Sequence, residues 1–115
     1  MGPVPEGLSA FVRARLDDED RDADLFHEPS CRIAVAAGGT RPSGPLVPAG
    51  CDCPVPERMH DEVGLKRLTV RDLEGRIERA PDTAPSLDAV IALMALKALA
   101  LEYASHPRWR EEWRP

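Results

Sequence analysis

The chain has 115 residues, a formal net charge of −5 and only five aromatic side chains of the Phe, Tyr and Trp types. This length suits one domain, residues 1–115, with one modest core that aliphatic side chains must fill. Most of the negative charge lies in residues 1–30, which hold eight acidic side chains against three arginines. Broad nonspecific binding to nucleic acid depends on Lys and Arg contacts to phosphates, so this charge argues against it.

Residues 8–25 are expected to form an amphipathic helix after a proline-containing start. Arg13, Arg15 and the acidic run that begins at Asp17 are expected to face outward. We interpret the acidic run as a solvated helix face rather than a partner patch. The apolar side chains that recur at helical spacing are Leu8, Phe11, Val12 and Leu16.

Residues 27–56 are dense in glycine and proline, which excludes a helix and predicts a long irregular loop. A short β-hairpin within it, made by residues 31–35 and 46–47, is an alternative that the alternating pattern allows. A loop of this length in a small domain is typically functional, disordered or fixed by a ligand.

Cysteine and histidine side chains lie at both ends of this loop. Structural zinc needs four nitrogen or sulfur ligands, usually supplied as two close pairs, and such a loop can be folded by the metal itself. His27 with Cys31, and Cys51 with Cys53, would supply those pairs, and His60 is a less suitable fourth ligand. The alternative is three thiols that bind no metal. We expect a cytoplasmic location, because no signal-peptide-like apolar run begins the chain and three cysteines suit a reducing compartment.

Residues 69–80 are predicted to form the next helix. Thr69 is expected to be its N-cap, and Pro81 to end it. Leu65 and Leu68 belong either to a preceding turn or to a backward extension of the same helix.

Residues 86–104 form the stretch around which the fold is expected to be organised. Ser86 can cap the helix, and apolar side chains then surround it on nearly all sides, which indicates a core helix covered by several neighbours. Leu93, Met94 and Leu96 are expected to be almost fully buried. A membrane span is disfavoured by the short length and three ionisable side chains. We expect a homodimer that buries part of this helix.

Residues 107–113 are predicted to be a last short helix with Pro107 in its first position. Trp109 and Trp113 would then share a face and cap the core. The alternative is a partner-binding surface made by Trp109, Trp113 and Arg110, which could stack on bases or a peptide.

Both ends of the chain resemble a family of small uncharacterised actinobacterial and actinophage proteins. The opening LSAFVRARLDDED and the ending ALEYASHPRWREEWRP carry the resemblance, which covers roughly 30 residues. It implies a bacterial, cytosolic setting, and members often carry a few Cys and His in the middle. Cys31, Cys51 and Cys53 depart from the family's CxxC-like spacing, and the family brings no assigned activity.

These observations together predict a small, mainly α protein with an interaction or regulatory role and no catalytic activity. Its partner would be another protein or a second copy of itself. The alternative is a nucleic-acid-associated accessory protein that uses the Arg- and Trp-rich tail. Catalysis is less favoured, because His60-Asp61-Glu62 lacks the downstream cysteine pair of zinc deaminases.

Overall fold

The computed structural model describes residues 4–27, 53–80 and 86–115. This part of the chain is helical and holds no β-strand, which confirms the mainly α fold. The predicted β-hairpin, together with Cys31 and Cys51, lies outside the described residues. The elements are α1 (Leu8–Asp22), the 3₁₀ helix η1 (Ala23–Leu25), α3 (Val55–Glu78), α4 (Leu87–Leu101) and the 3₁₀ helix η2 (Glu111–Trp113).

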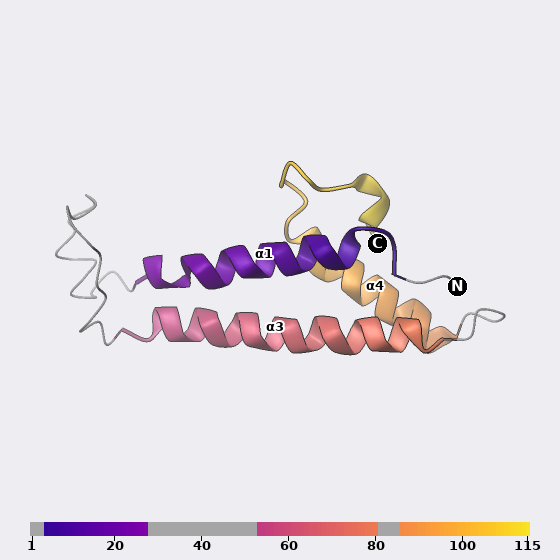
Figure 1. Ribbon diagram of the computed structural model, residues 1–115, viewed down its shortest axis with the longest axis horizontal. Coiled ribbons are helices and arrows are strands. Elements are labelled where there is room, and N and C mark those ends of the chain that lie inside the picture. The colour runs from indigo at the N-terminus through magenta and orange to yellow at the C-terminus, as the bar shows by residue number, and fades with distance from the viewer. Residues whose placement is uncertain (1–3, 28–52, 81–85) are drawn as a thin grey trace.

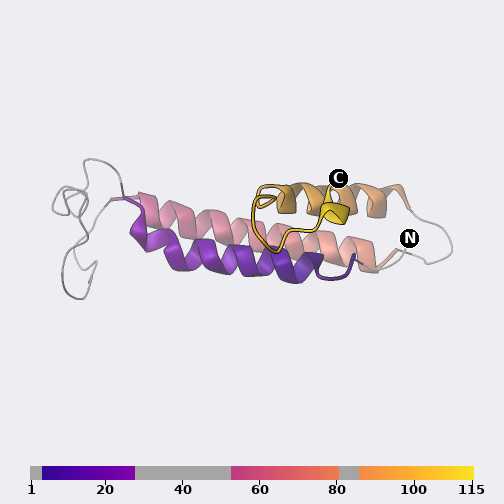
Figure 2. The ribbon, with the colours of Figure 1, turned by 90° about the horizontal axis from the view of Figure 1, so that it is seen from above.

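Helices α1 and α3 lie side by side and antiparallel, and α4 packs across one half of the pair (Figures 1 and 2). That half contains the start of α1 and the end of α3. The C-terminal tail returns over the start of α1 and ends beside it (Figure 1).

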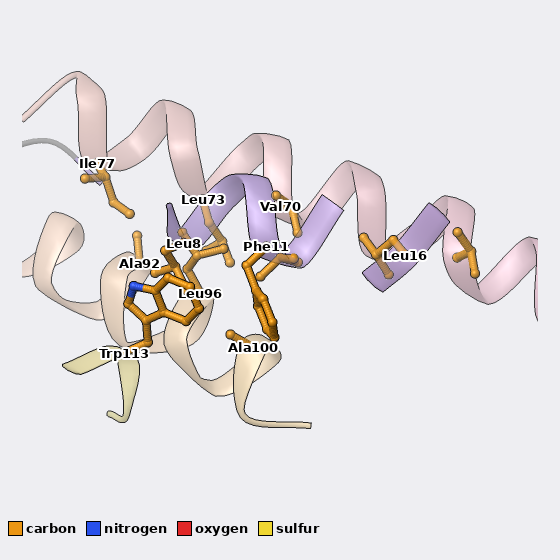
Figure 3. Packing of buried hydrophobic residues seen from close by; sticks show 12 residues of the cluster. Leu8, Phe11, Leu16, Val70, Leu73, Ile77, Ala92, Leu96, Ala100 and Trp113 are labelled. Atoms are coloured by element: carbon orange, nitrogen blue, oxygen red, sulfur yellow. The ribbon is translucent and has the colours of Figure 1, made fainter. Parts of the chain in front are cut away.

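The core lies where the three helices and the tail meet (Figure 3). Aliphatic side chains dominate it, as the composition requires, and two aromatic rings close one side. Its buried members are Leu8, Phe11, Val12, Leu16, Val63, Val70, Leu73, Ile77, Ala92, Leu96, Ala100 and Trp113.

The prediction for α1 is confirmed in its start and its buried face, but the α-helix ends at Asp22 and the 3₁₀ helix η1 forms the rest of the predicted range. Leu8, Phe11, Val12 and Leu16 are all at most 5% exposed. The acidic run that follows is engaged with α3, where Arg67 approaches Asp17 to 2.8 Å and Lys66 approaches Glu19 to 3.6 Å. These ion pairs join α1 and α3, and the Lys66–Glu19 pair lies beside the end of α4, where Lys66 also donates to Glu102.

The helix predicted for residues 69–80 corresponds to α3, and its predicted start at Thr69 is wrong. α3 begins at Val55, so Thr69 lies in the helix interior, where its Oγ1 donates a hydrogen bond to the carbonyl oxygen of Leu65. The proline-rich sequence before it suggested a loop as far as residue 56. Proline is tolerated in the first turn of a helix, however, and Pro56 occupies that turn here.

The predicted position of α4 is confirmed, but part of its predicted burial is wrong. Ser86 caps the helix by accepting a hydrogen bond from the Ala89 backbone N–H at 3.1 Å. Leu96 is fully buried, whereas Leu93 is only partly buried and Met94 is 55% exposed. The reason is that α1 and α3 cover α4 along one side only. In the described part of the chain, no helix is long and apolar enough to cross a membrane.

The tail is not the predicted helix of residues 107–113. Turns follow α4, and only Glu111–Trp113 forms a short 3₁₀ helix. Trp109 and Trp113 nevertheless come together, with ring centroids 5.8 Å apart in an edge-to-face arrangement. Trp113 is buried in the core and Trp109 packs against it, so the two side chains cap the core as predicted.

Two glycines give a matched test of this packing. Gly7 precedes α1 with φ of +80°, and a Cβ there would lie 3.3 Å from Cζ2 of Trp113. We expect Gly7→Ala to lower the free energy of unfolding by about 1–3 kcal/mol, because the left-handed backbone strains any L side chain. Gly64 lies within α3 with open space around its Cα, so Gly64→Ala should raise stability by about 0.5–1 kcal/mol. Urea denaturation of both variants checks this, and equal effects would contradict the packing of Trp113 on Gly7.

Candidate functional site

Helix α4 has two apolar faces of different character. The face against α1 and α3 is built mostly from small side chains, which let the helices approach closely. Its fully buried residues are Ala89, Ala92, Leu96 and Ala100. Figure 3 shows Ala92, Leu96 and Ala100 among the core side chains of the other two helices.

The opposite face of α4 carries large apolar side chains that remain in solvent. Leu87, Ile91, Met94 and Leu101 are 75%, 51%, 55% and 36% exposed, and Ala98 lies exposed among them. We call these five residues the outer stripe. Single exposed apolar side chains are ordinary on a protein surface, but a continuous row of them typically marks an interaction site.

The spacing of the outer stripe is that of a coiled-coil seam. Successive members are four, three, four and three residues apart, so they occupy positions d, a, d, a and d of a heptad repeat. The fully buried residues of α4 fall at positions b, c and f, on the other side of the helix. Such a stripe can receive the knobs of another helix while α4 stays packed in its own bundle.

Charged side chains border the outer stripe on both edges. Asp88 and Glu102 lie on the e edge, and Lys97 lies on the g edge. Arg76 binds Asp88 through Nη2 at 2.6 Å and, by this hydrogen bond, lowers the pKa of the Asp88 carboxyl. Lys66 donates to Glu102 at 3.1 Å. Both carboxylates keep more than half of their side chains exposed, at 62% and 51%, so they remain accessible beside the stripe.

The candidate partner-binding residues of the tail lie in different environments. Trp113 is 3% exposed and packs against Phe11 with ring centroids 5.0 Å apart, while Trp109 lies partly buried beside it. Arg110 is exposed and places its guanidinium 5.6 Å from the Trp113 ring centroid. Because Phe11, Gly7 and Arg110 contact the Trp113 ring, it offers no open face on which a base could stack.

Two of the four candidate zinc ligands come together at the end of the α1–α3 pair. His27 follows η1 and Cys53 precedes α3, and Sγ of Cys53 lies 3.7 Å from Nδ1 of His27. With Zn–S near 2.3 Å and Zn–N near 2.0–2.1 Å, tetrahedral geometry places a sulfur and a nitrogen ligand about 3.6 Å apart. The two side chains therefore stand at a separation that fits shared zinc. Among the described residues, no group of three or more metal-ligating side chains is assembled.

A second histidine cluster was not foreseen from the sequence. His60 on α3 lies between two carboxylates of the α1 and η1 segment, with Nδ1 2.7 Å from Asp20 and Nε2 3.0 Å from Asp24. The hydrogen bond to Asp20, then that to Asp24, raises the pKa of the His60 imidazole. Because the partners are distant in sequence, only the acidic run opposite a histidine could have indicated the cluster.

The His60 cluster makes a prediction for pH dependence. A folded-state pKa above the unfolded value means that the contribution to stability is complete below the unfolded pKa, near 6.5, and is lost as the pH rises through the folded pKa. NMR titration of the imidazole should give a pKa above 6.5 in the native protein. Asp20→Asn should lower that pKa more than Asp24→Asn does, and an unchanged value in both variants would contradict the geometry.

The comparisons with known proteins give a family but no activity. A family model described as a family of unknown function (DUF6221) matches residues 6–115. The searches of curated proteins and of solved structures returned no match.

Proposed function

We propose a function from this chain's own surfaces, because the chain belongs to DUF6221, a family of unknown function. The protein is a small helical interaction protein, without catalytic activity, that binds another helix through the outer stripe of α4. The cytoplasmic location and actinobacterial source expected from the sequence belong to the same proposal.

The observation that carries this proposal is the exposure of the outer stripe. Leu87, Ile91 and Met94 are each more than half exposed, although α4 has a separate face for the core. Their side chains therefore contribute little to folding, and each leaves apolar area in contact with water. Covering this area is favourable and needs no rearrangement of the bundle.

The chemistry of the stripe defines the class of partner. Heptad spacing favours an amphipathic α-helix as the partner. The apolar a and d side chains of such a helix can insert between the side chains of the outer stripe. The acidic e edge and the basic g edge select opposite charges on the partner's flanks. The proposal does not involve the tail, because Trp113 is buried in the core and Trp109 packs against it.

A designed helical peptide tests the proposal with a defined probe. The probe is a fluorescently labelled three-heptad peptide with Ile at a, Leu at d, Glu at e and Lys at g, held at nanomolar concentration. Its fluorescence anisotropy should rise with added protein, with a dissociation constant on the order of micromolar. Ile91→Glu should weaken binding at least about tenfold, because it places a charge in the seam.

Leu65→Glu is the matched control for this experiment. Leu65 is 64% exposed on α3 and lies outside the outer stripe, so its replacement adds the same charge without touching the seam. It should bind the peptide as the wild-type protein does. Absence of binding to the wild type at about 1 mM protein, or equal weakening in both variants, would contradict the proposal.

A zinc site at the end of the α1–α3 pair is the second candidate. The 3.7 Å separation between His27 and Cys53 supports it. Cys31 lies four residues after His27 and Cys51 two residues before Cys53, so the short connecting segments allow both thiols to reach the same ion. Zinc would fasten the residue 27–56 segment at its two ends and would not be catalytic.

Elemental analysis of protein purified without chelator tests the zinc proposal. We expect about one zinc per chain, bound with four ligands as in other structural sites. Cys53→Ser should lose most of the metal, whereas His60→Gln should retain it. A zinc content well below one per chain in the wild type, or equal loss in both variants, would contradict the proposed ligand set.

A further inference from the structure

We infer that the helix seated on the outer stripe is α4 of a second copy of this chain, lying parallel and in register. This inference rests on the proposed function and gives its partner. It follows from three properties of the stripe: the residue types at a and d, the charges at e and g, and the size of the row.

The residue types favour a two-stranded parallel pair. A β-branched residue at a with Leu at d favours dimers over higher oligomers in parallel coiled coils. The outer stripe has Ile91 at a and Leu87 and Leu101 at d. Met94 at the central d position is long and unbranched, so it can fill the space that Ala98 leaves.

The flanking charges decide the orientation. In a parallel dimer each g side chain faces the e side chain five residues further along the partner helix, so Lys97 of one protomer meets Glu102 of the other. Within the described residues Lys97 makes no ion pair. Glu102 accepts from Lys66 but stays 51% exposed, so its carboxylate can also accept from Lys97 of the partner. The other parallel pair, Val90 with Ala95, is apolar.

The antiparallel arrangement lacks this complementarity. There, e side chains face e side chains, and full overlap of the two helices places Asp88 opposite Glu102 of the partner. Two carboxylates opposed across a seam repel each other. The flanking charges therefore favour a parallel pair of α4 helices over an antiparallel pair.

The small area of the outer stripe determines how tightly two copies are expected to bind. Five side chains from each protomer, already partly covered by their own chains, form a small interface compared with the roughly 1,200–2,000 Å² of stable complexes. We expect a reversible dimer with a dissociation constant of about 10–100 μM.

Sedimentation equilibrium of the full chain over about 5–500 μM protein tests the inference. The wild type should pass from monomer to dimer in this range, and Leu65→Glu should do the same. Ile91→Glu should remain monomeric throughout, while its circular dichroism and melting temperature stay close to those of the wild type. Wild-type protein that is monomeric at all concentrations would overturn the inference, and the peptide experiment then decides the proposed function separately.

Charge exchange tests the direction of the pair. Lys97→Glu and Glu102→Lys should each raise the dissociation constant about three- to tenfold at low salt, since each turns two attractive contacts into repulsive ones. The double variant should return it to near the wild-type value. If Glu102→Lys strengthened the dimer, its new attraction to Asp88 would indicate an antiparallel pair and overturn the inference. A dimer that responds to none of the variants at positions 91, 97 and 102 would overturn it as well.

Discussion

Replacing Leu96 by alanine should lower the free energy of unfolding by about 2–5 kcal/mol, because the change removes buried methyl groups and leaves a cavity. Leu96 is fully buried between α4 and the α1–α3 pair, and it is the largest of the fully buried side chains of α4. Its fully buried neighbours on this face, Ala92 and Ala100, are too short to reach into the space.

Met94→Ala is the matched control, since it truncates a side chain of similar size on the same helix. Met94 is 55% exposed, so its loss should change stability by less than about 1 kcal/mol. Urea denaturation at a protein concentration below about 5 μM, where the proposed dimer is dissociated, keeps association out of the comparison. Similar losses in the two variants would contradict the assignment of inner and outer faces.

Trp113→Ala should also be strongly destabilising, by about 3–5 kcal/mol. The ring is 3% exposed and lies against Phe11 and Trp109, so it closes a side of the core that α1, α3 and α4 leave uncovered. Its loss would expose the start of α1 and free the tail after α4. Intrinsic tryptophan fluorescence from Trp109 should then report the tail's release before global unfolding.

Two further variants separate packing from polar contributions at this position. Trp113→Phe should recover most of the lost stability, because the indole N–H is buried without a hydrogen-bond partner in the described structure and contributes no bond to lose. Arg110→Ala removes only a cation–π contact at an exposed position and should cost less than about 1 kcal/mol. A tail that serves partner binding alone would leave stability unchanged in all three variants.

Local sequence patterns predicted the fold where one pattern dominates. The spacing of Leu8, Phe11, Val12 and Leu16 identified α1 and its buried face, and Ser86 identified the start of α4. The start of α3 was missed because Pro54 at its N-cap and Pro56 in its first turn resemble the prolines of the preceding sequence. Short-range spacing cannot distinguish a proline that starts a helix from one that prevents it.

The burial of α4 could not be read from its sequence for a different reason. Apolar residues surround the helix, so its hydrophobic pattern has no preferred direction, and alanines on the inner face look less important than Met94 or Ile91. The heptad spacing of the outer stripe was present in the sequence but was hidden among other apolar residues. His60 and its two carboxylates illustrate a further limit, since only the folded pair of helices brings them together.

Solvent relaxation of the Met94 and Leu96 methyl groups tests most directly whether α4 has one buried and one exposed apolar face. A soluble gadolinium chelate relaxes methyl groups in proportion to their exposure, and the chain has only three methionines to assign. In dilute protein the Met94 methyl should relax fast while those of Leu96 stay protected, and Met94 should become protected as the protein concentration rises through about 10–100 μM. A Met94 methyl as protected as those of Leu96 in dilute solution would contradict an exposed outer stripe. A relaxation that does not change with concentration would contradict the binding of a second copy at this stripe.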